Sequence, residues 1–100
     1  MHAKPDIIAK IYFYKTEEGG RKGPVSVELF HCPSEINGEK FDCGLEIGKN
    51  RTVAPGDTIT VPVYFLSPKI VRPMLTARSQ FKLWDGRFIA DCVVEEIIPE

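Results

Sequence analysis

Apolar and polar residues alternate along most of this chain, and turns that contain glycine or proline interrupt the alternation every few residues. Residues 7–15 show the pattern most clearly, with one apolar side and one mixed side. A period of two, carried by β-branched and aromatic residues, is typical of a β-strand with one buried face. The residues expected on that buried face are Ile7, Ala9, Ile11 and Phe13. The pattern therefore favours an all-β fold.

Five further segments follow the same rule, although some are shorter. The strands are predicted at residues 7–15, 25–31, 40–47, 58–66, 79–84 and 87–97. A chain of 100 residues forms one domain, and closing its strands into a barrel leaves no exposed sheet edge. The predicted fold class is all-β, a single six-stranded antiparallel β-barrel over residues 7–97. Residues 1–6 and 98–100 are expected to be terminal tails.

The turn signals between the strands have different strengths. Cys32-Pro33-Ser34 is expected to end the second strand, and Asn37-Gly38 to form a tight turn, because both of its residues tolerate positive φ. Pro55-Gly56-Asp57 is expected to start the fourth strand. Asp85-Gly86 predicts a two-residue hairpin loop before the last strand.

Three prolines and the last strand carry further expectations. Pro62 lies inside the segment 58–66 and indicates an edge, a bulge or a gap in the strand pairing, since proline donates no hydrogen bond. Pro68 ends that strand. The segment 69–76 is ambiguous, and Pro73 argues against a helix there. On the last strand, one predicted face holds Phe88, Ala90, Cys92 and Val94, and the other holds Ile89, Asp91, Val93 and Glu95.

The charges are nearly balanced over the whole chain, at a net −1, but they are unevenly distributed. Residues 25–68 hold three basic and six acidic residues, whereas residues 69–87 hold five basic residues and Asp85. The basic residues of the second stretch are Lys69, Arg72, Arg78, Lys82 and Arg87. The pattern predicts a basic strip on one side, although the small net charge gives no general argument for nucleic-acid binding.

The three cysteines have no regular spacing and no second metal-ligand pair beside them. His31 and Cys32 are adjacent on a predicted strand, so their side chains point to opposite faces and cannot act as a nucleophile and its base. Cys92 is expected in the core. Free thiols are the favoured interpretation, with a Cys32–Cys43 disulfide as the alternative. We therefore expect no metal, no cofactor and no enzymatic activity.

The expected location is the cytoplasm. Charges at Lys4, Asp6 and Lys10 argue against a secretory signal, and no apolar stretch approaches the length that spans a bilayer. Free thiols agree with a reducing compartment. No membrane partner is expected.

Several short motifs occur together in a recognisable order. The first strand leads to Glu17-Glu18-Gly19-Gly20-Arg21 and Pro24, followed by Pro55-Gly56-Asp57, Ser67-Pro68 and a last hairpin that ends Cys92-Val93-Val94. Over residues 6–97 this arrangement resembles the third domain of translation elongation factor Tu. The resemblance implies a six-stranded antiparallel barrel without chemistry of its own. In that family the barrel packs on the GTPase domain, binds the exchange factor and touches aminoacyl-tRNA.

The surface segments depart from the family's pattern. The segment after Pro24 lacks the tyrosine, arginine and glutamine residues that face tRNA in that family. The last loop, Trp84-Asp85-Gly86-Arg87, is one glycine shorter and has tryptophan where the family has arginine. The resemblance thus implies a retained scaffold with a different binding surface.

We therefore expect a protein-interaction domain: a regulator, a mimic of the elongation factor's surface, or an immunity-type protein. Aromatic residues on the outer face of a barrel, with arginine neighbours, are typical of protein interfaces, although scattered exposed apolar groups are also normal. The candidate partner-binding residues are Tyr12, Tyr14, Arg21, Lys22, Tyr64, Lys82, Trp84 and Arg87.

The alternative is an accessory RNA- or tRNA-binding factor of translation. The basic strip would contact phosphates, and Trp84 would stack on an unpaired base. The charges are equally consistent with a solvated face, and Trp84 with a cover for one barrel end. The loop from Gly19 to Lys22 lacks the pattern of a nucleotide-binding loop, so we expect a mobile hairpin loop rather than a nucleotide site.

Overall fold

The computed structural model describes residues 4–100 and confirms the predicted fold class. Six antiparallel strands close into one barrel, with the spatial order β1-β4-β3-β2-β5-β6 and β6 returning to β1. The strands are β1 (Ile7–Phe13), β2 (Leu29–Ile36), β3 (Glu39–Glu46), β4 (Thr58–Phe65), β5 (Gln80–Trp84) and β6 (Phe88–Ile97).

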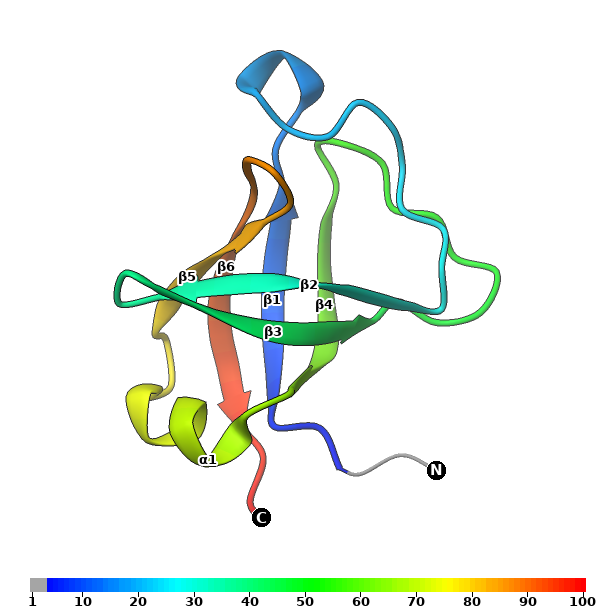
Figure 1. Ribbon diagram of the computed structural model, residues 1–100. Coiled ribbons are helices and arrows are strands. Elements are labelled where there is room, and N and C mark those ends of the chain that lie inside the picture. The colour runs from blue at the N-terminus through cyan, green and yellow to red at the C-terminus, as the bar shows by residue number, and fades with distance from the viewer. Residues whose placement is uncertain (1–3) are drawn as a thin grey trace.

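The β2–β3 hairpin crosses in front of β1, β4 and β6 in Figure 1. One end of the barrel carries the 3-10 helix η1 (Thr16–Glu18), and we call it the η1 end. The other end carries the short helix α1 (Pro68–Val71) and the C-terminus, and we call it the α1 end (Figure 1). The η1 end therefore holds the long loops, while the start of β1 and the end of β6 lie at the α1 end.

The core is formed by the inward faces of all six strands, as the alternation predicts. Ile7, Ala9, Ile11 and Phe13 of β1 are buried, and so are Ile59, Val61, Val63 and Phe65 of β4. Phe65 and Phe81 meet edge to face across the interior, with ring centroids 6.3 Å apart. Aromatic and branched side chains thus fill the barrel, and the opposite faces of the strands remain available at the surface.

The second strand is placed later in the chain than predicted. β2 begins at Leu29 and continues through Cys32-Pro33-Ser34, which was expected to end it. Val25 makes only an isolated bridge to Val53, and Val27 is 50% exposed. Pro33 is tolerated because the ladder between β2 and β5 contains only Ser34 and Glu35, so its missing N–H removes no bond from that ladder.

Two other turn and proline predictions are confirmed. Asn37 and Gly38 join β2 to β3, both with positive φ (52° and 84°). Pro62 lies at a gap in the pairing, because the β3–β4 ladder ends at Val63. The chain thus places its proline where no hydrogen bond to β3 is required.

The last hairpin differs from its prediction. Its loop contains Asp85, Gly86 and Arg87, one residue more than the two-residue signal indicates. A register shift follows, with Leu83 opposite Ala90 but Trp84 opposite Phe88. The irregularity turns Phe88 outward and Ile89 inward, at exposures of 38% and 1%. The predicted faces of this strand are therefore correct from Ala90 to Val94 and wrong at Phe88 and Ile89.

The segment 69–76 contains helix despite Pro73. α1 spans Pro68–Val71, and a 3-10 turn, η2, follows at Arg72–Met74. Proline is compatible with the first turn of a helix, where its missing N–H would have no partner. The expectation against a helix is wrong because both prolines lie at such first-turn positions.

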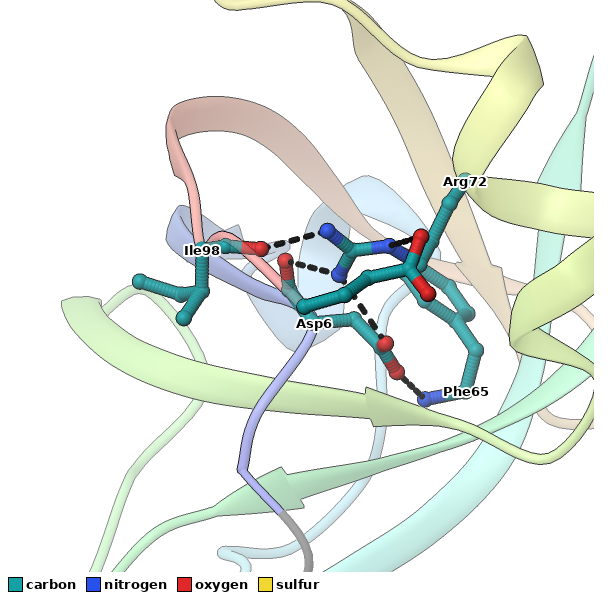
Figure 2. A network of polar contacts seen from close by, with 5 residues as sticks. Asp6, Phe65, Arg72 and Ile98 are labelled. Atoms are coloured by element: carbon teal, nitrogen blue, oxygen red, sulfur yellow. Dashed lines mark hydrogen bonds and ion pairs between the residues drawn. The ribbon is translucent and has the colours of Figure 1, made fainter.

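Arg72 connects the two chain ends to this helix, as Figure 2 shows. Its guanidinium donates to the main-chain oxygens of Asp6 and Ile98 and to the Asp6 carboxylate, while the same carboxylate accepts the Phe65 N–H at 2.8 Å. Residues 1–3 of the predicted 1–6 tail lie outside the described residues. Asp6 and Ile98 also bond directly, through the Ile98 N–H and the Asp6 oxygen at 3.0 Å.

Candidate binding surface

The candidate residues predicted from sequence fall into separate groups on the barrel. Tyr12, Tyr14 and Lys82 come together on the outer face of β1, β6 and β5. The two tyrosine rings lie 6.0 Å apart, and Lys82 Nζ lies 5.8 Å from the Tyr14 ring centroid. These three residues thus form one group on the barrel.

The polar atoms of this group are already paired within the chain. Tyr12 donates to Glu18 Oε1 at 2.6 Å, and Tyr14 donates to Asp91 Oδ1 at 2.5 Å. Lys82 Nζ donates to the same Asp91 oxygen at 2.5 Å and to the Tyr14 hydroxyl at 3.1 Å. The hydrogen bond to Asp91 raises the pKa of Lys82, so the ammonium stays charged. An anionic ligand would have to compete with Asp91 for this cation.

A second group lies at the η1 end. Arg21, Lys22 and Arg87 line a hollow of about 290 Å³ together with Asp85. Arg21 Nη1 bonds Asp85 Oδ2 at 2.8 Å, and its guanidinium lies 5.3 Å from the Phe30 ring centroid. This pair fixes the loop after η1 to the β5–β6 loop, and Lys22 and Arg87 are left exposed beside it.

The predicted basic strip is not continuous. Lys69 and Arg72 lie at the α1 end, whereas Arg87 lies in the β5–β6 loop toward the opposite end (Figure 1). Arg72 is largely buried against Asp6, and Lys82 is paired with Asp91. These basic residues are close in sequence but do not share one surface, because β5 runs along the length of the barrel and separates them.

Trp84 packs on its neighbours rather than projecting from the hairpin tip. Its ring meets Phe88 edge to face at 5.0 Å, and Lys40 Nζ lies 4.6 Å from the ring centroid. It follows the buried Leu83 on β5 and therefore points outward. Trp84 and Phe88 together form an aromatic pair on the outer face.

This aromatic pair lies at one end of a row that crosses the outer surface of four strands. Leu66, just after β4, donates its N–H to the Asp42 oxygen at 3.0 Å, and Asp42 is opposite Pro33. Pro33 precedes Ser34, which faces Leu83 in the β2–β5 ladder, and Trp84 follows Leu83. We call Leu66, Asp42, Pro33, Trp84 and Phe88 the outer row. All but Asp42 are apolar, and Leu66 is 75% exposed.

A groove of about 450 Å³ adjoins the outer row above Gly44. Leu29 and His31 form one wall and Tyr64 and Leu66 the other, so the three strands β2, β3 and β4 contribute. A Cβ atom at Gly44 would lie 3.3 Å from Leu29 Cδ1. The residue on the floor of the groove has no side chain, and His31 also lies within 3.4 Å of that Cβ position.

Sequence reasoning identified only part of this surface. Tyr64 was predicted as a binding residue, and its hydroxyl donates to Glu46 Oε1 at 2.6 Å at the edge of the groove. Phe88 was assigned to the core and Pro33 to a strand end, so the outer row was missed. Gly44 gave the one usable signal, because a glycine inside a predicted strand often marks a close approach.

The cysteines offer no nucleophile at this surface. Cys32 and Cys43 are opposite each other in the β2–β3 ladder, buried and free, and the Cys43 thiol donates to the Cys32 oxygen at 3.3 Å. The contact with Cys43 and burial raise the pKa of Cys32, and burial raises that of Cys92. The thiols of Cys32 and Cys92 are thus protonated at neutral pH.

Within residues 4–100, no group of three or more potential ligand side chains is arranged to hold a metal ion. None of the helices in the same range has both the length and the apolar character to cross a membrane. No protein-family model matches the sequence, and no curated protein is significantly similar to it. The binding surface must therefore be interpreted from its own residues.

Proposed function

We propose that this chain is a non-enzymatic protein-interaction module that binds its partner through the outer row and the adjoining groove. The observation that carries the proposal is the row itself, in which Leu66, Pro33, Trp84 and Phe88 present apolar surface across four strands. Apolar residues gathered on one face of a small barrel mark an interaction site more often than scattered apolar residues do. Aromatic anchors beside a recess are typical of the centre of protein interfaces.

The distribution of charge supports binding over catalysis. The closest charged pair on the outer face, Lys82 and Asp91, neutralises itself on an open surface. The groove is lined mainly by apolar groups, and its two thiols, Cys32 and Cys43, are buried. An active site would need polar groups that converge on one point of a cleft.

The motif resemblance to the third domain of elongation factor Tu supports the same proposal. Barrels of that family work through their exteriors, and this chain keeps the barrel while its outer residues differ. We therefore propose a cytoplasmic regulator, mimic or immunity-type protein that engages another protein. A mimic would occupy a surface that the elongation factor normally uses.

The proposal is tested by affinity capture with two double variants. Leu66→Lys with Phe88→Lys disrupts the outer row. Val27→Lys with Ile70→Lys is the matched control, because both residues are exposed and apolar but lie outside the row. We expect proteins recovered from the cells that produce this chain to bind the wild type and the control and to be lost from the row variant. Equal recovery by both variants, or no protein recovered by the wild type, would contradict the proposal.

A second candidate function is RNA binding, favoured by the shared hollow of Arg21, Lys22 and Arg87. Titrating the chain with tRNA and with single-stranded RNA at several salt concentrations tests it. Phosphate contacts predict affinity that falls steeply with salt and drops in Lys22→Ala and Arg87→Ala. Absence of binding at low salt would eliminate this candidate.

A further inference from the structure

We propose that the groove above Gly44 binds an extended segment of a partner protein in which a bulky apolar side chain and an arginine or lysine are two residues apart. The apolar side chain lies in this groove between Leu29 and Leu66, and the cation pairs with the Asp42 carboxylate. This inference rests on the proposed protein-interaction function and specifies the chemistry of the partner.

The apolar half of the site is formed by the walls of the groove. Leu29 and Leu66 face it from opposite sides, and Leu66 is the most exposed large apolar residue among those described. Because Gly44 has no side chain, Leu29 and His31 lie close over the β3 backbone, 3.3 and 3.4 Å from the Cβ position, and their surfaces line the groove there. A bulky apolar side chain placed there covers surface that is otherwise in contact with water.

The charged half of the site is Asp42. It lines the groove and is exposed, and no cation in residues 4–100 forms an ion pair with it. The described lining contains no lysine or arginine, and the neighbouring Glu46 already accepts the Tyr64 hydroxyl. A partner cation complements this acidic rim, whereas a phosphate of RNA or a lipid would be repelled.

The spacing of the motif follows from strand geometry. Gly44 and Asp42 are two residues apart on β3, a separation of about 6.8 Å along a strand. Alternate side chains of an extended partner share one face at the same spacing of about 6.8 Å. The recognised pattern is therefore apolar–x–basic in either chain direction, with the middle side chain pointing away from the groove.

A random peptide library displayed on phage tests this chemistry directly. We expect selection on the wild-type chain to enrich peptides with the apolar–x–basic pattern. Selection on Asp42→Lys is expected to replace the basic residue with an acidic one, and selection on Gly44→Leu to remove the pattern. Glu95→Lys, an acid-to-lysine change at an exposed position of β6, is the matched control and keeps the wild-type pattern.

A synthetic peptide that carries the enriched pattern then measures how much the Asp42 charge contributes to affinity. Its affinity is expected to fall about two- to fivefold in Asp42→Asn, the range of an exposed ion pair. When this peptide binds the wild-type chain, the largest changes in the chain's amide chemical shifts should be at Gly44 and Phe65. Thermal unfolding of every variant checks that it is folded, and Leu66→Ala replaces Gly44→Leu if the latter is not.

The outcomes separate this inference from the proposed function. Enriched peptides that depend on Leu66 and Phe88 but show no basic residue, or ignore Asp42→Lys, would overturn the partner chemistry and leave the interaction module intact. Absence of any peptide dependent on the outer row would count against both. A dimer in sedimentation that Gly44→Leu dissociates would make a second copy of the chain the occupant and overturn the inference.

Discussion

Arg72 Nη1 lies 3.0 Å from the main-chain oxygen of Asp6 and 3.1 Å from its carboxylate Oδ1 (Figure 2). The two side chains are only 14% and 13% exposed, so the ion pair is shielded from water. The same guanidinium also holds the main-chain oxygen of Ile98. A single side chain from η2 therefore fixes the start and the end of the barrel sheet.

Arg72→Ala is expected to lower the free energy of unfolding by about 3 kcal/mol, because it leaves the Asp6 carboxylate and a main-chain oxygen shielded without their cation. Urea denaturation measures the change. The matched control is Lys69→Ala on the exposed side of the adjacent helix, with an expected effect within about 0.5 kcal/mol. A loss below about 1 kcal/mol for Arg72→Ala would show that the network adds little.

Gly20 is expected to tolerate no side chain. A Cβ atom there would lie 2.3 Å from the Tyr14 main-chain oxygen, so the backbone would have to move. Gly20→Ala should cost about 2–3 kcal/mol of unfolding free energy, as overpacking does. Gly23→Ala is the control, because nothing lies within 4 Å of its Cβ position. Similar unfolding free energies for the two variants would contradict the close contact.

The Lys82–Asp91 pair predicts a loss of stability in acid. Partial burial raises the pKa of Asp91, but hydrogen bonds from Lys82 and Tyr14 outweigh it and hold the pKa below its ordinary value of 3.8. The contribution is therefore present above pH 3.8 and is lost as the pH falls through the lowered pKa. Unfolding of Asp91→Asn should depend less on pH below 4 than unfolding of the wild type. Glu95→Gln is the control, because Glu95 is an exposed acid that forms no ion pair within residues 4–100. If the stability of Asp91→Asn falls with pH as steeply as that of the wild type, the prediction is refuted.

The three tyrosines should ionise above pH 10. A hydrogen bond to Glu18 raises the pKa of Tyr12, burial and the bond to Asp91 raise that of Tyr14, and the bond to Glu46 raises that of Tyr64. Since these are all the tyrosines of the chain, the whole absorbance titration shifts to higher pH. Glu46→Gln should move one third of the amplitude back toward the ordinary value of 10.0. If the absorbance titration of the folded wild type coincides with that of the denatured chain, the tyrosine pKa values are not raised and the prediction is wrong.

The three buried thiols should be slow to react in the native state. Cys32, Cys43 and Cys92 are all below 7% exposed, and the pKa values of Cys32 and Cys92 are raised. A thiol reagent that absorbs visible light on reaction should label them only on the timescale of unfolding, and should label all three at once in denaturant. Rapid labelling of a native thiol at pH 8 would indicate a local opening of β2 or β3.

Where apolar and polar residues alternate regularly, the buried face of a strand could be predicted without knowledge of the fold. In β1 the buried face follows a period of two and was predicted residue by residue, and β4 shows the same period. Asn37-Gly38 was equally predictable, because both residues accept the positive φ that the turn requires. β2 was misplaced because Pro33 looks like a strand end, and only the short β2–β5 ladder makes it acceptable.

The proposed binding surface depended on longer-range geometry. A single extra residue in the last hairpin shifts the register and moves Phe88 from the predicted core to the outer row. The basic residues from Lys69 to Arg87 are close in sequence but are distributed along the barrel. Gly44, Leu66 and Pro33 become neighbours only through the order of β4, β3 and β2.

The sequence by itself determined that the chain forms an all-β barrel, since hydrophobic periodicity and turn residues act over a few neighbouring positions. The tertiary structure decided which residues share a surface and which charges neutralise one another. Those relationships arise from strand order and register, and a local pattern contains neither.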